Sequence, residues 1–133
     1  MDIMDELANF NVFKKSRFIQ IDNEFINSNK YTIYEKMVYL SLNTYCYNKN
    51  NCYPSQTTIA KNLNISRTMV IKAMQGLEEK NGLIIINRKA ESNRKVSNLY
   101  ILSEIDNNTG EFISESLDEF RHYKNKTVIL KGK

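Results

Sequence analysis

The sequence contains one proline, four glycines and no tryptophan in 133 residues. Proline and glycine this scarce exclude collagen-like and low-complexity chains, which are rich in both residues. Their scarcity instead indicates a helical chain with short connections. Hydrophobic residues make up 41% of the chain and charged residues 26%, which is typical of a globular protein, and the length predicts a single domain.

Cysteine and histidine are also scarce. Cys46 and Cys52 lack the CxxC spacing and, with His122 as the single histidine, cannot form a standard zinc site. A disulfide between them would require an oxidising compartment. The N-terminus is acidic where a signal peptide would be basic, and no apolar run approaches the roughly 20 residues of a membrane span. We expect a cytoplasmic protein with reduced thiols and without a metal, a cofactor, a membrane partner or a small-molecule ligand.

The sequence also lacks the motifs of an enzyme. It has no Gly-rich phosphate loop, no nucleophile motif and no carboxylate pair in a fixed pattern. His122 is interpreted as a surface residue. We therefore expect a protein that binds a partner without catalysing a reaction.

A short helix, a tight turn and a longer helix are predicted over residues 55–82. Pro54 cannot continue a helix interior, and Ser55 is a preferred N-cap, so a helix begins there with an apolar side formed by Ile59, Ala60 and Leu63. Ser66 is a second N-cap, which leaves only three or four residues between the helices. The second helix should end near Gly82, where glycine can adopt the left-handed conformation.

The second helix has one apolar and one polar face. Met69 or Val70, Ala73 or Met74, and Leu77 recur at three- and four-residue steps. The opposite face carries Arg67, Thr68, Ile71, Lys72 and Gln75. Arginine, lysine, threonine and glutamine can contact the edges of bases when a helix lies in the major groove of DNA.

The stretch PSQTTIAKNLNISRTMVIKAMQGLEEKNGLI resembles the winged helix-turn-helix domains of bacteriophage and plasmid replication-initiation proteins and related small regulators. The similarity extends upstream to YTIYEKMVYLSL and downstream to SNLYIL. It therefore covers residues 18–103, with Asn81 as an extra residue before Gly82. The resemblance implies an α+β, mainly helical fold, with a three-helix core and a small antiparallel β wing, followed by a short C-terminal extension.

The expected organisation has three parts: an N-terminal arm over residues 1–17, with a basic run at Lys14, Lys15 and Arg17, the winged helix-turn-helix domain over 18–103, and the extension over 104–133. In the extension, Asp106 to Gly110 predict a hairpin turn that continues through Glu111 to Ile113. Ser116 and Glu119 predict a capping box that opens a short helix, and Val128 to Leu130 predict a final strand.

Within the domain, the pattern predicts a brief strand at Phe18 to Ile21 and a helical turn capped by Asp22. Thr32 and Glu35 form a capping box for a helix buried along two stripes, one with Ile33, Met37 and Leu40 and the other with Tyr34, Val38, Leu42 and Tyr45. A short strand is expected at Cys52 and Tyr53. Two further strands, Leu83 to Asn87 and Leu99 to Leu102, are expected to flank the wing loop.

Positive charge is concentrated in residues 54–103, which hold eight Lys or Arg residues and three acidic residues. Such an excess is the sign expected of a surface that displaces counterions from phosphates, although a solvated surface is the simpler alternative. The predicted contacts form three groups: the recognition helix with Ser66, Arg67, Thr68, Ile71, Lys72 and Gln75; the phosphate contacts of the first helix with Ser55, Gln56, Thr57 and Lys61; and the wing with Arg88, Lys89, Arg94 and Lys95.

Two functions follow from this pattern. The first is sequence-specific binding of double-stranded DNA, in replication initiation, transcription regulation or plasmid transfer. The second is a winged helix used for protein interaction or oligomerisation, which the fold alone does not exclude. Burial of Arg67, Lys72 and Gln75 against another part of the chain would favour the second. A homodimer formed through the C-terminal extension is possible in either case.

Overall fold

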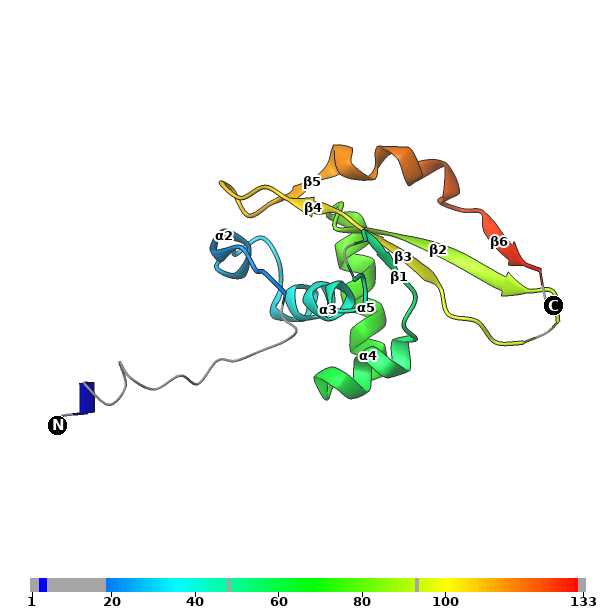
Figure 1. The fold of residues 1–133 in the computed structure, drawn as a ribbon, viewed down its shortest axis with the longest axis horizontal. Coiled ribbons are helices and arrows are strands. Elements are labelled where there is room, and N and C mark those ends of the chain that lie inside the picture. The colour runs from blue at the N-terminus through cyan, green and yellow to red at the C-terminus, as the bar shows by residue number, and fades with distance from the viewer. Residues whose placement is uncertain (1–2, 5–18, 48, 93, 132–133) are drawn as a thin grey trace.

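Three helices form the centre of the molecule in a computed structural model that describes residues 3–4, 19–47, 49–92 and 94–131. They are α3 (Ile33–Asn43), α4 (Gln56–Leu63) and α5 (Arg67–Glu79), and the one-turn helix α2 (Asn23–Ile26) precedes them. Helix α3 packs against both α4 and α5 (Figure 1). The predicted strand at Phe18 to Ile21 is wrong in its described part, because residues 19–21 have no strand structure. Phe18 and the predicted basic run lie outside the described residues.

Each core helix begins at the N-cap that the sequence predicts. The Thr32 hydroxyl accepts from the Glu35 amide at 3.1 Å, and the Glu35 carboxylate accepts from the Thr32 amide at 2.9 Å, which confirms the capping box. Ser55 accepts from the Thr58 amide at 3.0 Å, and Ser66 accepts from the Met69 amide at 3.1 Å. Capping of this kind satisfies donors that the first helical turn would leave unpaired.

Helix α5 ends at Glu79, and the left-handed residue that follows it is Asn81 rather than Gly82. Asn81 has a φ angle of 64°, and the Gly82 amide donates back to the Leu77 carbonyl at 2.7 Å. Asparagine tolerates this conformation better than most residues, so the extra residue before the glycine provides the turn. Gly82 is needed for a different reason, since an added Cβ atom would lie 2.7 Å from the ring of Phe112.

The prediction that α3 is buried along two stripes is wrong. Ile33 is 68% exposed, and Tyr34 and Met37 are 41% and 40% exposed. The buried side consists of Val38, Tyr39, Leu40 and Leu42. The helix packs on α4 and α5 along this side, so each predicted stripe is buried only in part: Leu40 of the first and Val38 and Leu42 of the second.

A four-stranded sheet has the order β1-β3-β2-β6. Its strands are β1 (Asn51–Cys52), β2 (Leu83–Ala90), β3 (Leu99–Leu102) and β6 (Thr127–Leu130). The β2–β3 hairpin is antiparallel, with Leu83 opposite Leu102, and β1 pairs antiparallel with β3. The short first strand therefore lies one residue earlier than predicted, because Cys52 rather than Tyr53 is opposite Tyr100.

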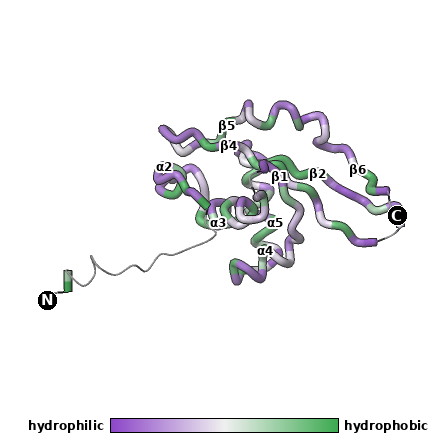
Figure 2. The backbone as a smooth tube through the Cα atoms, in the orientation of Figure 1, coloured by the Kyte–Doolittle hydropathy of each residue, from purple (hydrophilic) through white to green (hydrophobic). Residues whose placement is uncertain are grey.

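The hairpin is covered on both faces. The helices lie on one side of it, while the 3-10 helix η1 (Ser114–Tyr123), which follows β5 (Phe112–Ile113), packs on the other (Figure 1). Ile84, Ile86 and Ile101 face Leu117 of η1 and form a second core cluster. Figure 2 shows the first half of β2 in the hydrophobic colour and most of its second half in the hydrophilic colour. The continuous apolar run at the start of β2 thus packs against the helices on one face of the sheet and against η1 on the other.

Strand β6 pairs with β2 in parallel, with Asn87 opposite Thr127 and Ala90 opposite Leu130. The predicted final strand is confirmed, but β2 extends to Ala90 instead of stopping at Asn87. Arg88 and Lys89 consequently lie in a strand rather than in the wing loop. The pairing with β6 supplies the backbone partners that allow this extension.

The expected hairpin after the wing is present, with β4 (Glu104–Ile105) paired to β5 and Gly110 at a φ angle of 72°. The predicted capping box at Ser116 is wrong. The Ser116 hydroxyl donates to the Ile113 carbonyl at 2.6 Å and accepts from the Glu104 amide at 3.0 Å, so it ties η1 to the hairpin instead. The segment is a 3-10 helix that begins at Ser114 without a side-chain cap.

Together the three-helix core and the antiparallel hairpin make a winged helix-turn-helix. The predicted fold class, α+β with a C-terminal extension, is confirmed. No helix within the described ranges is both long enough and apolar enough to cross a membrane.

Candidate nucleic-acid interface

The corner between α4 and α5 is fixed by its two serine caps and by Asn64. Asn64 has a φ angle of 55° and ends α4, and the Ile65 amide donates to the Ala60 carbonyl at 3.1 Å. Ser66 then caps α5 directly. Three residues therefore separate the helices, as predicted, and this short connection holds the start of α5 close to α4.

One face of α5 is buried and the other faces solvent. Val70, Ala73, Met74 and Leu77 are buried, which confirms the predicted apolar face. The predicted contact residues on the other face differ in exposure. Ile71 is half-buried, and Ser66 is exposed but its hydroxyl caps the helix. The remaining four are exposed: Arg67, Thr68, Lys72 and Gln75. Four polar side chains thus share an open helix face.

The predicted phosphate contacts of α4 differ in exposure and in whether their side chains already form hydrogen bonds. Thr57 and Lys61 are exposed. The Ser55 hydroxyl is committed to Thr58, both to its amide at 3.0 Å and to its hydroxyl at 2.8 Å. Gln56 is half-buried, and its Oε1 accepts from Nη2 of Arg67 at 2.9 Å.

Tyr100 lies behind the contact between Gln56 and Arg67. Its side chain is 1% exposed in β3 and hydrogen-bonds with the side chains of Gln56 and Asn98. Burial raises the pKa of Tyr100, and these two hydrogen bonds oppose the rise. The Tyr100 side chain therefore links the wing strand β3 to the first residue of α4.

An ion pair between the exposed Lys80 and the buried Glu35 joins α3 to the end of α5. Nζ of Lys80 lies 2.6 Å from Oε1 of Glu35, which is 5% exposed. Gly76 allows this approach, since an added Cβ atom would lie 2.0 Å from Oε2 of Glu35. Removing Lys80 would leave the buried Glu35 carboxylate without its charged partner, whereas an exposed Lys80 without Glu35 would remain solvated.

The predicted wing residues also divide into two kinds. Nε of Arg88 donates to the Ser97 carbonyl at 2.8 Å, and its guanidinium lies 5.0 Å above the centre of the Tyr53 ring. Arg88 is half-buried and joins the two sides of the hairpin. Lys89, Arg94 and Lys95 are exposed and can meet phosphates.

Sequence reasoning missed three lysines that lie near the wing. Strand β6 runs beside the outer half of β2, and the Glu91 amide donates to the Leu130 carbonyl at 3.0 Å. Lys124, Lys126 and Lys131 flank this strand and are exposed. The sum of charges hid them, because the extension as a whole carries slightly more acids than bases. The run from Thr127 to Leu130, with lysines on both sides, indicated a strand. It did not indicate which strand it pairs with, because that partner lies forty residues earlier.

Residues 32–84 match a family model described as a helix-turn-helix domain. The match spans α3, α4 and α5 and reaches the start of β2. The match agrees with the helix-turn-helix that the structure shows, and such a domain suggests DNA as a partner. No curated protein and no solved structure matches the chain.

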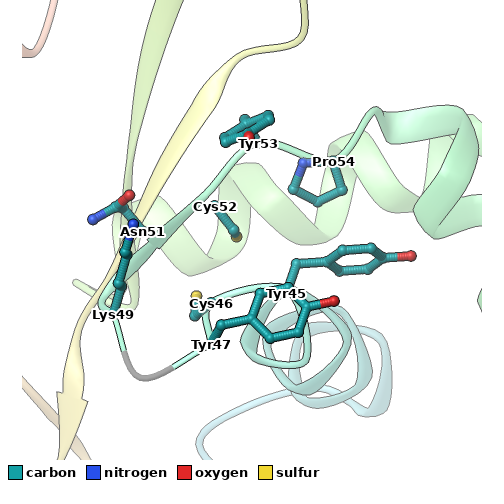
Figure 3. A pocket seen from close by; sticks show the side chains of 8 residues that line it. All are labelled: Tyr45, Cys46, Tyr47, Lys49, Asn51, Cys52, Tyr53 and Pro54. Carbon is teal, nitrogen blue, oxygen red and sulfur yellow. The ribbon is translucent and has the colours of Figure 1, made fainter.

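A pocket of about 290 Å³ lies between the end of α3 and β1, and its lining residues fall within the matched residues 32–84 (Figure 3). Cys46 and Cys52 are buried side by side in its wall as free thiols. A hydrogen bond with Cys46 and burial both raise the pKa of the Cys52 thiol. Within the part of the chain that the structure describes, no group of three or more potential ligands gathers to hold a metal ion.

Proposed function

We propose that the protein binds double-stranded DNA in a sequence-specific manner, with α5 in the major groove and the wing on the adjacent backbone. The observation that carries the proposal is the exposure of Arg67, Lys72 and Gln75 on one face of α5, beside the short corner of the motif. In a helix-turn-helix, this face meets the base edges. The exposed Lys89, Arg94 and Lys95 would supply phosphate contacts.

The alternative is a winged helix that binds proteins without reading DNA. It would be favoured if the polar face of α5 were buried against another part of the chain. The exposure of Arg67, Lys72 and Gln75 favours DNA binding instead. Lys124, Lys126 and Lys131 add positive charge near the wing, which supports the same choice.

The proposed setting is the cytoplasm, in plasmid or bacteriophage replication initiation, in transcription regulation or in DNA transfer. The proposal is for a binding protein without catalytic activity. Selection of bound sequences from random duplexes would identify the site. Mapping that site to an origin, a promoter or a transfer region would then separate the three processes.

The binding test compares Arg67→Ala with Arg94→Ala on the selected duplex and on a scrambled duplex. Arg67→Ala should lower the ratio of the two affinities, because a bidentate contact to a base is worth about 1 to 3 kcal/mol of discrimination. Arg94→Ala should weaken binding to both duplexes alike and flatten the log-log salt dependence by about one unit.

Two results would count against these roles. If the wild-type protein fails to bind selected and random duplexes at low salt, the DNA-binding proposal is wrong. If Arg94→Ala collapses the affinity ratio while Arg67→Ala leaves it unchanged, the wing is the reading element. Comparable unfolding midpoints for the two variants serve as the control, since both side chains are exposed.

We further propose that the protein forms a homodimer through β6. This strand lies at one edge of the sheet, and its Ile129 side chain is 62% exposed. An edge strand presents backbone groups that can pair with a second chain. Two copies related by a twofold axis would place two recognition helices on one duplex.

A further inference from the structure

The side chain of Arg67 is held before any ligand is bound. Arg67 is the first residue of α5 and is exposed, yet its Nη2 donates to Oε1 of Gln56 at 2.9 Å. Gln56 is in turn the first residue of α4. The contact therefore joins the starts of the two helices of the motif, where an arginine would otherwise sample many rotamers.

Gln56 is itself restrained by the buried Tyr100 of β3. Since its oxygen accepts from Arg67, its amide NH₂ group is the part available to donate to the Tyr100 hydroxyl. Tyr100 cannot move easily, because its ring is 1% exposed and its backbone is paired with Cys52 and Ile85. The result is a continuous series of contacts from the wing strand to the recognition helix.

We infer that Gln56 is a positioning residue, which presets the Arg67 guanidinium for reading a base. The inference rests on the proposed DNA binding and gives Gln56 a role different from the predicted phosphate contact. A preset side chain loses less entropy on binding than a free one. A free arginine can still meet a phosphate of any sequence, so loss of Gln56 should reduce discrimination more than general affinity.

The neutral charge of Gln56 makes this role separable from a phosphate contact. Replacement of Lys61 removes a charge and should flatten the salt dependence of binding to every duplex by about one unit. Replacement of Gln56 leaves the charge of the protein unchanged. It should lower the ratio of selected to scrambled affinity while the salt dependence on the scrambled duplex stays as in the wild type.

The experiment measures both affinities for the full chain and for Gln56→Ala, Gln56→Met and Tyr100→Phe. Loss of one hydrogen bond corresponds to about a two- to tenfold fall in the affinity ratio for the Gln56 variants. Tyr100→Phe keeps the buried ring and should produce a smaller fall. Asn62→Ala is the matched control, an exposed uncharged amide near the other end of α4 and outside the predicted contacts, and should leave the ratio unchanged.

A double variant tests whether Gln56 acts through Arg67. In the Arg67→Ala background, Gln56→Met should cause no further fall in the ratio, because the positioned group is already absent. Additive falls would show that Gln56 contacts DNA itself and would overturn the inference. Gln56→Met retains the length of the side chain and a good helix former, so it covers the case in which Gln56→Ala fails to fold.

A readout without DNA separates this inference from the proposed function. Nitrogen-15 relaxation of the Arg67 side chain should show restricted motion in the wild type and greater motion in Gln56→Met. A wild-type protein that binds no duplex would refute the proposed function. A wild type that discriminates between duplexes, with an unchanged ratio and unchanged Arg67 motion in Gln56→Met, would refute the positioning role alone.

Discussion

Replacement of Leu117 by alanine should detach the C-terminal extension from the wing. Leu117 is fully buried in η1 and packs in the second core cluster with Ile84, Ile86 and Ile101. The change removes three carbons, worth about 2.4 kcal/mol at roughly 0.8 kcal/mol per buried methylene. Incomplete collapse of the cavity adds to this, so we expect a loss of about 2.5 to 4 kcal/mol in the free energy of unfolding.

The location of that loss is as informative as its size. If η1 and β6 open as a unit before the helices unfold, the variant loses local rather than global stability. The Glu91 amide reports this opening, because its hydrogen bond to the Leu130 carbonyl depends on β6 staying in place. We expect faster hydrogen exchange there than in the wild type. Binding to every DNA sequence should also weaken, because the wing strand loses its partner.

Urea unfolding followed by circular dichroism measures the global term, and hydrogen exchange measures the local one. Leu117→Met is the matched control, since it conserves volume and should cost less than about 1.5 kcal/mol. A Leu117→Ala protein with unchanged unfolding and unchanged exchange at Glu91 would refute the account of the second core cluster.

Three further predictions concern separate parts of the fold. Asn81→Ala should reduce the free energy of unfolding by about 1 to 2 kcal/mol because alanine is strained at a positive φ angle, whereas Asn81→Gly should match or exceed the wild type in the same urea titration. Burial raises the pKa of Tyr39, so the folded state keeps that proton more tightly than the unfolded chain, and stability should fall as the pH rises above about 10. Tyr39→Phe should flatten that fall in pH-dependent unfolding, and an identical pH profile would contradict the assignment. Ile129→Lys should convert a dimer to a monomer in light scattering, and a wild-type particle of monomer mass would remove the dimer proposal.

The helix starts could be predicted from sequence because capping is local. Thr32, Ser55 and Ser66 each accept a hydrogen bond from an amide three residues away, so the relevant chemistry lies within one turn. The buried face of α5 could be predicted for a similar reason, since a helix repeats at three and four residues. Both signals are independent of the rest of the chain.

The errors arose where a distant partner decides the structure. Arg88 and Lys89 belong to a strand because β6 pairs with them, and that partner is forty residues away. Ile33 is apolar but exposed, because the periodicity of a helix does not show how many neighbours cover it. The contact between Gln56 and Arg67 joins two helices, so neither helix pattern alone reveals it.

The parallel pairing of β2 with β6 has a consequence for the newly synthesised protein. Helix α5 ends at Glu79, and β6 begins at Thr127, which is made about 2 to 10 seconds later at roughly 5 to 20 residues per second. During that interval the helix-turn-helix sequence is complete, while Arg88 and Lys89 have no strand to pair with. Ile84, Ile86 and Ile101 also lack Leu117 as a cover. The segments that cover the outer face of the hairpin and extend its sheet are thus the last parts of the fold to be synthesised.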